Sequence, residues 1–175
     1  MTEPRDPLTP RQIAALLRSG AEAVRAEVEG LPLTLARWRP APAEWCVLEV
    51  VGHLTEAEQR GFAGRIRQML AADTPRLLLW DPGEVARNRR DDEKTAAAVL
   101  DEFRALRETS VAFVEALGEA DLARAGEHPT VGRLTVRDLL YEWVHHDRNH
   151  LRQILANVQA FAWPHMGNAR RFSSA

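Results

Sequence analysis

Four long segments of this chain carry apolar side chains at the three- and four-residue spacing of an amphipathic helix. They cover roughly residues 10–29, 47–70, 92–117 and 136–160, and the prolines fall at their ends or between them. No sustained alternation of apolar and polar residues, and no hairpin turn between β-branched runs, competes with this pattern. Because a helix with one apolar stripe buries that stripe against a neighbour, the sequence predicts an all-α fold, a four-helix bundle.

Two of the predicted helices begin at a capping box. Thr9 is followed three residues later by Gln12, and Thr135 is followed by Asp138. In such pairs the first side chain accepts a hydrogen bond from a free backbone N–H group, and the second reaches back to the cap. Cys46 stands where the second helix should begin, so we interpret it first as a cap, although its sulfur could also serve as a soft metal ligand.

The connections between these helices differ in character. Residues 31–44 contain three prolines and are expected to form a loop, as are the residues around Pro129 and Gly132. Residues 73–92 are the least regular region. Within them, the run Leu77-Leu78-Leu79-Trp80 is too apolar for a freely solvated loop. We expect this run to cap the core, line the mouth of a pocket or join a dimer interface.

Length and charge narrow the classes of protein to which the chain can belong. With 175 residues, it is expected to form a single domain over residues 1–175. A net charge of −2 without a basic block indicates neither a nucleic-acid partner nor a membrane surface. No segment approaches the roughly 20 apolar residues of a membrane span. The single cysteine excludes an intramolecular disulfide and is typical of a reducing compartment, so a cytoplasmic location is expected.

The most informative residues chemically are two histidines four positions apart in the last predicted helix, His146 and His150. They lie on one helical face, so their imidazoles can chelate one metal ion. The spacing alone is common, and two semi-buried histidines bonded to carboxylates or water would explain it as well. Both histidines nevertheless belong to the apolar inner stripe, where an unpaired polar group costs about 1–3 kcal/mol. The other members of that stripe are Leu139, Trp143 and Ile154.

A third histidine, His53, lies on the apolar face of the second predicted helix. A lone histidine there is more often a core residue than a ligand, but three inward-facing imidazoles suit zinc, nickel or a similar divalent ion. Three protein ligands also leave coordination positions open, as in catalytic metal sites. The neighbouring Gly52 weakens the helix but lets another element approach closely. Asp147 replaces the glutamate of the metalloprotease pattern, so it is expected beside the ligands or at the surface.

The other three histidines are weaker candidates. His145 lies about 100° around the helix from the first histidine of the pair and should face outward or sideways. His128 is expected in a loop, and His165 is expected in an irregular C-terminal tail. Each is most simply a surface residue.

Three features together resemble a known family: Trp45 before the second helix, a Gly-His-Leu within it, and the motif of the closing helix. That helix opens with Leu134-Thr135-Val136-Arg137-Asp138-Leu139-Leu140 and continues with His146-Asp147-x-x-His150-x-x-Gln153-Ile154. The order resembles the DinB-like (DNA-damage-inducible, YfiT-type) metalloproteins over roughly residues 10–158.

The resemblance implies a four-helix bundle in which His53, His146 and His150 hold a divalent metal ion, often in a homodimer. Relatives include S-transferases that use bacillithiol and a maleylpyruvate isomerase that uses mycothiol. The resemblance therefore implies a metal-dependent transferase that activates a low-molecular-weight thiol for attack on a small electrophile. The alternatives are a non-catalytic metal-binding stress-response protein, a metal-dependent hydrolase, and a dimerisation module whose histidines are core residues.

Two polar residues lie one helical turn from the predicted ligands. Glu49 precedes His53, and Gln153 follows His150. Each is either a hydrogen-bond partner that orients an imidazole or a solvated residue of the helix surface.

Overall fold

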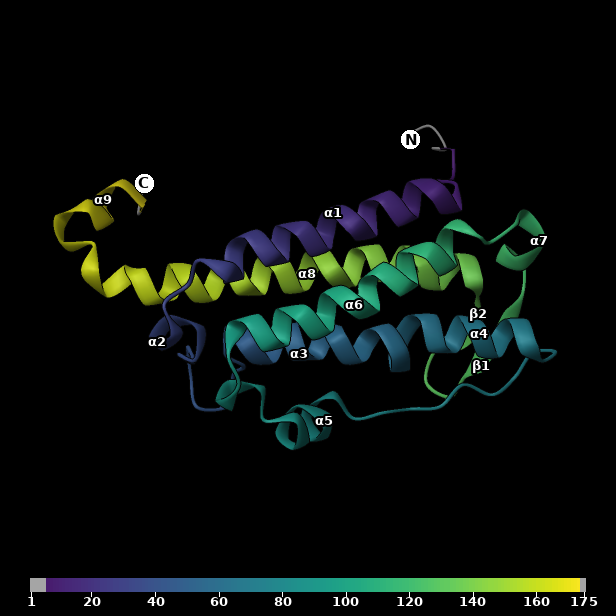
Figure 1. Cartoon of the computed structure of the whole chain (residues 1–175), viewed down its shortest axis with the longest axis horizontal. Coiled ribbons are helices and arrows are strands. Elements are labelled where there is room, and N and C mark those ends of the chain that lie inside the picture. The colour runs from purple at the N-terminus through teal and green to yellow at the C-terminus, as the bar shows by residue number, and fades with distance from the viewer. Residues whose placement is uncertain (1–5, 174–175) are drawn as a thin grey trace.

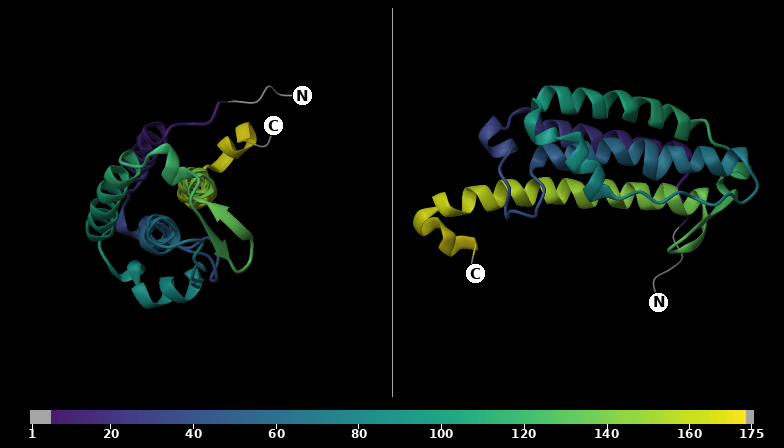
Figure 2. Two further views of the ribbon diagram at one scale, coloured as in Figure 1. Left: turned by 90° about the vertical axis from the view of Figure 1, so that its right-hand side faces the viewer. Right: turned by 90° about the horizontal axis from the view of Figure 1, so that it is seen from below.

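Four helical rods run side by side in the computed structural model, which describes residues 6–173 (Figure 1). The first two rods in the sequence lie diagonally across the bundle, because each packs against both of the others, as the end-on view in Figure 2 shows. The predicted all-α four-helix bundle is thus confirmed, while the two ends of the predicted 1–175 domain lie outside the described residues. The rods are α1 (Pro10–Glu29), α3 (Val47–Glu56) with its continuation α4 (Ala63–Ala71), α6 (Ala96–Glu115), and α8 (Val136–Ala162).

Both predicted capping boxes are present in the structure. The Thr9 hydroxyl accepts the N–H group of Gln12 at the start of α1, and that of Thr135 accepts the N–H group of Asp138 at the start of α8. The long rods that follow these caps place their apolar stripes against one another. Within residues 6–173, no helix combines the length and apolar character that crossing a bilayer requires.

The second rod is interrupted where the sequence predicts a continuous helix over residues 47–70. A π-helical segment, η1 (Ala57–Phe62), separates α3 from α4. Gly64 permits the wider turn, because a Cβ atom there would lie 1.7 Å from the carbonyl oxygen of Gln59. The segment buries the Glu58 carboxylate in the core. Such single π turns often occur at functional sites, and this one begins four residues after His53.

The connection between α6 and α8 contains a hairpin, so the expectation of a loop without strands is wrong. Strands β1 (Ala125–His128) and β2 (Gly132–Thr135) pair antiparallel, with His128 opposite Gly132. Each strand has only four residues, too few to produce a recognisable alternation. Gly132 adopts a φ of +78°, which the turn requires and other residues rarely adopt.

Short helices occupy regions expected to be loop or irregular. Helix α5 (Pro82–Arg89) lies within residues 73–92, and Asp81 caps it by accepting backbone N–H groups of its first turn. Pro82 fits the first turn of this helix, because the N–H group that proline lacks is not needed there. Helix α6 begins at Ala96 rather than near residue 92, since Thr95 caps it. The remaining short helices are α2 (Leu33–Ala36), η2 (Asp91–Glu93), α7 (Glu119–Leu122), η3 (Trp163–His165), η4 (Gly167–Ala169) and α9 (Arg170–Ser173).

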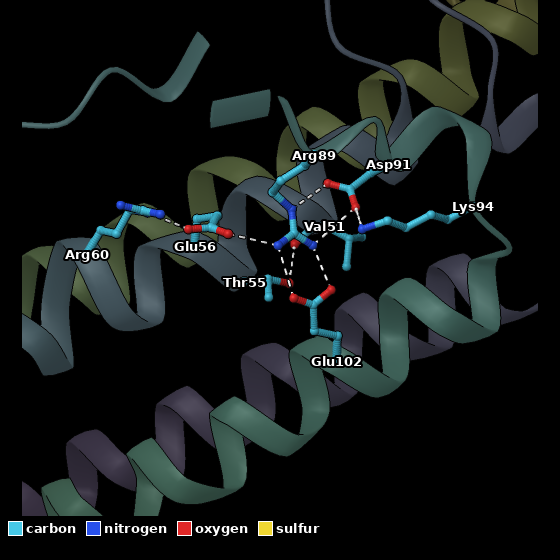
Figure 3. A network of polar contacts seen from close by, with 8 residues as sticks. All are labelled: Val51, Thr55, Glu56, Arg60, Arg89, Asp91, Lys94 and Glu102. Atoms are coloured by element: carbon cyan, nitrogen blue, oxygen red, sulfur yellow. Dashed lines mark hydrogen bonds and ion pairs between the residues drawn. The ribbon is translucent and has the colours of Figure 1, made fainter. Parts of the chain in front are cut away.

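A network of charged side chains ties α5 to the second rod (Figure 3). Arg89 forms ion pairs with Glu56 at 2.8 Å, with Asp91 at 2.7 Å and with Glu102 at 2.7 Å. The buried Asp91 carboxylate comes so close to α3 that a Cβ atom at Gly52 would lie 1.7 Å from its Oδ2. The predicted role of Gly52, which is to allow close approach of another element, is confirmed.

Replacing Gly52 by alanine is expected to lower the free energy of unfolding by about 1–2 kcal/mol. Alanine favours a helix by about 1 kcal/mol, but overpacking costs about 1–3 kcal/mol. In addition, Asp91 could move aside only by weakening its ion pairs with Arg89 and Lys94. Urea unfolding of the full chain measures the effect. Gly30→Ala is the control, because a Cβ atom there meets nothing within 4 Å, and equal losses in the two variants would contradict the steric explanation.

Candidate metal centre

Three histidines from two helices meet where α3 packs on α8. His53 lies in the last turn of α3, and His146 and His150 lie one turn apart on α8. One ring nitrogen from each histidine lies within 4.8 Å of the other two, and the Nε2 atoms of His53 and His146 are 3.0 Å apart. The structure therefore brings together the three residues that the sequence singles out.

Aromatic rings enclose this histidine cluster. The centroid of the Trp45 ring lies 4.9 Å from that of His53, and Trp80 stacks on His53 with a centroid distance of 5.6 Å. Phe62, from the π-helical segment, meets His146 edge-on at 5.1 Å. As a result, His53 is only 7% exposed. The cluster is thus shielded from bulk water on several sides.

Burial favours the neutral form of two of these imidazoles. Desolvation, followed by the influence of His150 and His146, lowers the pKa of His53 to about 3. Desolvation also lowers the pKa of His150, and His146 acts in the same direction. A metal ion binds the neutral ring through its lone pair, so these two rings are in the metal-binding form at neutral pH.

The hydrogen bonds of the rings indicate which lone pairs are free. Oε1 of Gln153 lies 2.9 Å from Nδ1 of His150. Because an amide oxygen only accepts, Nδ1 carries the proton and the Nε2 lone pair of His150 stays free. The predicted alternative in which Gln153 orients an imidazole therefore matches the geometry, as in many metal sites.

The other two rings satisfy a direct test of fit to a cation. Their Nδ1 atoms are buried and have no hydrogen-bond partner among the described residues. Their Nε2 atoms, on His53 and His146, face each other at 3.0 Å, a distance that two lone pairs tolerate only with a proton or a cation between them. Three converging imidazoles are a donor set that zinc and nickel accept. The residues therefore fit a divalent metal ion.

A cavity of about 640 Å³ opens beside the cluster, and His53 and His146 form part of its wall. His150 is not among the residues that line the cavity. The volume falls within the range of about 300–1,000 Å³ that small-molecule sites occupy. The other lining residues are Ala57, Gly61, Phe62, Arg65, Trp80, Pro82, His128, Val131, Leu134, Asp138, Leu139 and Glu142.

The apolar run before α5 is divided between the core, the cavity and the surface. Leu77 is 1% exposed and belongs to the core, while Trp80 lines the cavity. Leu78 and Leu79 are 73% and 59% exposed. Capping of the core and lining of a pocket are therefore both observed, and the third alternative, a dimer interface, stays a prediction for the two exposed leucines.

Directly behind the histidines lies a buried cluster of charges that sequence reasoning missed. Arg107 of α6 donates to Glu58 at 2.8 Å and to Asp147 at 2.6 Å, and all three are at most 4% exposed. Asp147 is thus not at the surface, and its Oδ1 lies 4.0 Å from Nδ1 of His146. Burial raises the pKa of Asp147, but the charge and hydrogen bonds of Arg107 act together with the neighbouring His146 and hold that pKa below its usual value. The sequence could have indicated this cluster through Arg107, a charged residue that lies four positions after Phe103 and so on the same inward face of the helix.

Other candidates have different roles from those expected. Glu49 is neither beside His53 nor solvated, because it is buried, accepts a hydrogen bond from Arg39 at 2.7 Å and accepts the backbone N–H group of Cys46 at 2.9 Å. Cys46 is the N-cap residue of α3, as predicted, and burial raises the pKa of its thiol to about 11. The prediction of a surface loop for His128 is wrong, since it lies in β1 and lines the cavity.

The last two histidines lie away from the site. His145 is exposed and bonds to Asn149 on the outer face of α8 at 2.8 Å, and His165 is exposed in the short turn η3. Both match the expectation of surface residues.

Comparisons with known proteins agree with this architecture. A family model described as the DinB superfamily matches residues 15–154. The uncharacterized protein YuaE of Bacillus subtilis (strain 168) is 27% identical over 141 residues, which cover 73% of this chain and 86% of YuaE. Among solved structures, Bacillus subtilis YfiT has a similar fold, with a TM-score of 0.81 at 19% identity over 93% of this chain and 94% of YfiT. YfiT is described as a probable metal-dependent hydrolase with an unusual four-helix bundle topology.

Proposed function

Because the chain belongs to the DinB superfamily, we propose that His53, His146 and His150 hold a divalent metal ion, zinc or nickel. We further propose that the protein is a metal-dependent enzyme that acts on a small substrate in the adjoining cavity. The convergence of three imidazoles, two of which line this cavity, carries the proposal. The description of YfiT as a probable metal-dependent hydrolase supports it.

The residues around the site have separate roles. A bound divalent ion supplies Lewis acidity, which makes a thiol or a water molecule nucleophilic at neutral pH. His53 and His146 line the cavity and would hold the ion at its wall, while the hydrogen bond with Gln153 fixes the orientation of the His150 ring. The ring of Trp80 covers His53 and limits the access of bulk water.

The reaction that we propose is attack by a low-molecular-weight thiol, of the bacillithiol or mycothiol type, on a small electrophile. Its support is the family resemblance of the closing-helix motif together with a cavity of about 640 Å³, which can hold small reactants. Hydrolysis is the second candidate, and the description of YfiT favours it. The resemblance also leads us to propose a homodimer, which light scattering on the full chain can test.

Removal of the metal is expected to abolish turnover. Protein purified without a histidine tag should be stripped with a chelator, reloaded with zinc or nickel, and assayed for conjugation of several thiols to 1-chloro-2,4-dinitrobenzene and for hydrolysis of a nitrophenyl ester. We expect activity only in the reloaded protein and expect none in His150→Ala. His145→Ala is the matched control, because it removes an exposed histidine of the same helix and should retain activity.

The two assays separate the candidate reactions. Conjugation identifies thiol transfer, and ester cleavage identifies a hydrolase. Bound metal without turnover of any of these substrates would favour the non-catalytic stress-response protein over an enzyme. Activity that survives complete removal of the metal would contradict the proposal.

A further inference from the structure

Arg65 of α4 lines the cavity and forms no ion pair with any carboxylate of residues 6–173. One of its terminal nitrogens, Nη2, donates to the carbonyl oxygen of Leu78 at 3.1 Å, while Nε is buried and has no hydrogen-bond partner in the described part of the chain. No carboxylate of the described residues lies within ion-pair distance of its guanidinium group. Arg89 and Arg107 differ in this respect, because each is paired with at least two carboxylates.

An unpaired guanidinium group in such a position is costly. Burial lowers the pKa of Arg65, which shows that the protein disfavours its charged form there. Arginine nevertheless keeps its proton, because its ordinary pKa lies far above neutral. Its planar fork of N–H groups matches the two oxygens of a carboxylate or phosphate. An oxyanion in the cavity would supply the missing counter-charge.

His128 adds a second donor on the hairpin side of the same cavity. Its Nδ1 accepts the backbone N–H group of Thr130 at 3.2 Å, so in the neutral ring the proton is on Nε2. Desolvation and the nearby charge of Arg65 both lower the pKa of His128, which favours this neutral, Nε2-protonated ring. The cavity therefore offers N–H donors from two elements, α4 and β1.

The carboxylates that line the cavity leave these donors available. The Asp138 carboxylate accepts the backbone N–H group of Thr135 at 2.8 Å and so caps α8. Glu142 is exposed and makes no ion pair with any described residue. Between the donors and the histidines, the wall is largely apolar, with Phe62 and Leu139 among its members.

We propose that Arg65, assisted by His128, binds a carboxylate or phosphate group of a small substrate whose reactive centre lies at the histidine end of the cavity. The assignment of the reactive centre rests on the proposed function, whereas the oxyanion site itself does not require a bound metal. Arg65 thereby selects anionic substrates over neutral analogues of the same shape.

The test uses the zinc-reconstituted full chain and three probes that share a phenyl ring: phenylacetate, phenylacetamide and phenyl phosphate. Binding is followed by NMR titration. Wild-type protein is expected to bind one or both anions at least about tenfold more tightly than the neutral amide, since hydrogen bonds to charged groups are the stronger ones. The relative affinities of the two anions distinguish a carboxylate site from a phosphate site.

Variants of two arginines on α4 test the assignment. Arg65→Gln should remove the preference for the anion, and Arg65→Lys, which keeps the charge, should restore part of it. Arg67→Gln is the matched control, because Arg67 is exposed, packs over Phe113 and does not line the cavity. Circular dichroism verifies that each variant is folded. An unchanged preference in Arg65→Gln would overturn the proposal, as would equal binding of anion and amide by wild-type protein.

His150→Ala separates this proposal from the metal site, because His150 does not line the cavity. We expect the preference for the anion to survive in this variant even though metal binding is weakened. If the preference disappears in His150→Ala and persists in Arg65→Gln, the anion binds the metal and the proposed role of Arg65 is wrong. A chain that binds no metal, yet shows the Arg65-dependent preference, would refute the metal site and retain the anion site.

Discussion

Replacing Arg107 by methionine is expected to lower the free energy of unfolding by about 3–5 kcal/mol, the usual cost of removing one partner from a buried ion pair. Arg107 is 3% exposed and compensates two carboxylates, on Glu58 and Asp147. It also donates to the backbone carbonyl of Leu17 at 2.8 Å, which ties α6 to α1. Methionine would fill much of the space but would leave both carboxylates without a cation.

The loss of unfolding free energy in Arg107→Met should become smaller as the pH falls. In the wild-type protein, burial raises the pKa of Asp147, but Arg107 and His146 together outweigh it and lower that pKa. This stabilisation is present at neutral pH and is lost as the pH falls through the folded pKa. Burial already raises the pKa of Glu58 in the wild-type protein, although Arg107 opposes this. In the variant, without the cation, burial raises the pKa of Asp147 and raises that of Glu58 further. The cost of burying the ionised carboxylates is complete at neutral pH. It shrinks as the pH falls toward the pKa of about 4 that carboxyl groups have in the unfolded chain. The difference in unfolding free energy between the two proteins should therefore narrow as the pH falls from neutral toward about 4.

Urea unfolding at several pH values measures this effect. Arg104→Met is the matched control, because Arg104 lies one turn earlier on α6 and its ion pair with Asp101 is exposed, with side-chain exposures of 62% and 70%. Exposed pairs contribute about 0–1 kcal/mol. If the two variants lose similar amounts of unfolding free energy, Arg107 is not the central cation of a buried cluster.

His146→Ala is expected to weaken zinc binding by more than about 100-fold, because even the loss of a residue that only orients a ligand costs about 10–100-fold. His146 contributes both a nitrogen that faces His53 at 3.0 Å and part of the cavity wall. Gln153→Ala should have the intermediate effect of about 10–100-fold, since Gln153 fixes the ring of His150 through one hydrogen bond.

Competition with a chromophoric zinc chelator measures these affinities. His145→Ala is the control, because it removes a neighbouring imidazole that points away from the cluster. We expect its affinity to equal that of the wild-type protein. If His145→Ala and His146→Ala weaken binding equally, zinc binds at the surface rather than at the predicted ligands.

The sequence predicted the parts of this fold that depend on long local patterns. Helical periodicity and the capping pairs at Thr9 and Thr135 placed the starts of α1 and α8, and the pairing of stripes gave the bundle. The histidines stood out because polar rings on an apolar stripe need partners. Their meeting in space is now observed, while their role as metal ligands stays a prediction.

Features that depend on distant contacts or on single backbone groups could not be predicted in this way. The π-helical segment arises from a one-residue change of register that leaves the apolar pattern almost intact, and Gly64, which permits it, is a weak local signal. The hairpin was too short for its alternation to be seen. Arg65 and His128 lie 63 positions apart in the sequence, so only the folded chain shows that they share a cavity.

Elemental analysis of protein purified without a histidine tag and reconstituted with zinc or nickel tests the central claim most directly. We expect about one divalent ion per chain in the wild-type protein, and a clear deficit in His150→Ala measured alongside it. Wild-type protein that holds no stoichiometric divalent metal after reconstitution would contradict the metal site and the enzyme proposed around it.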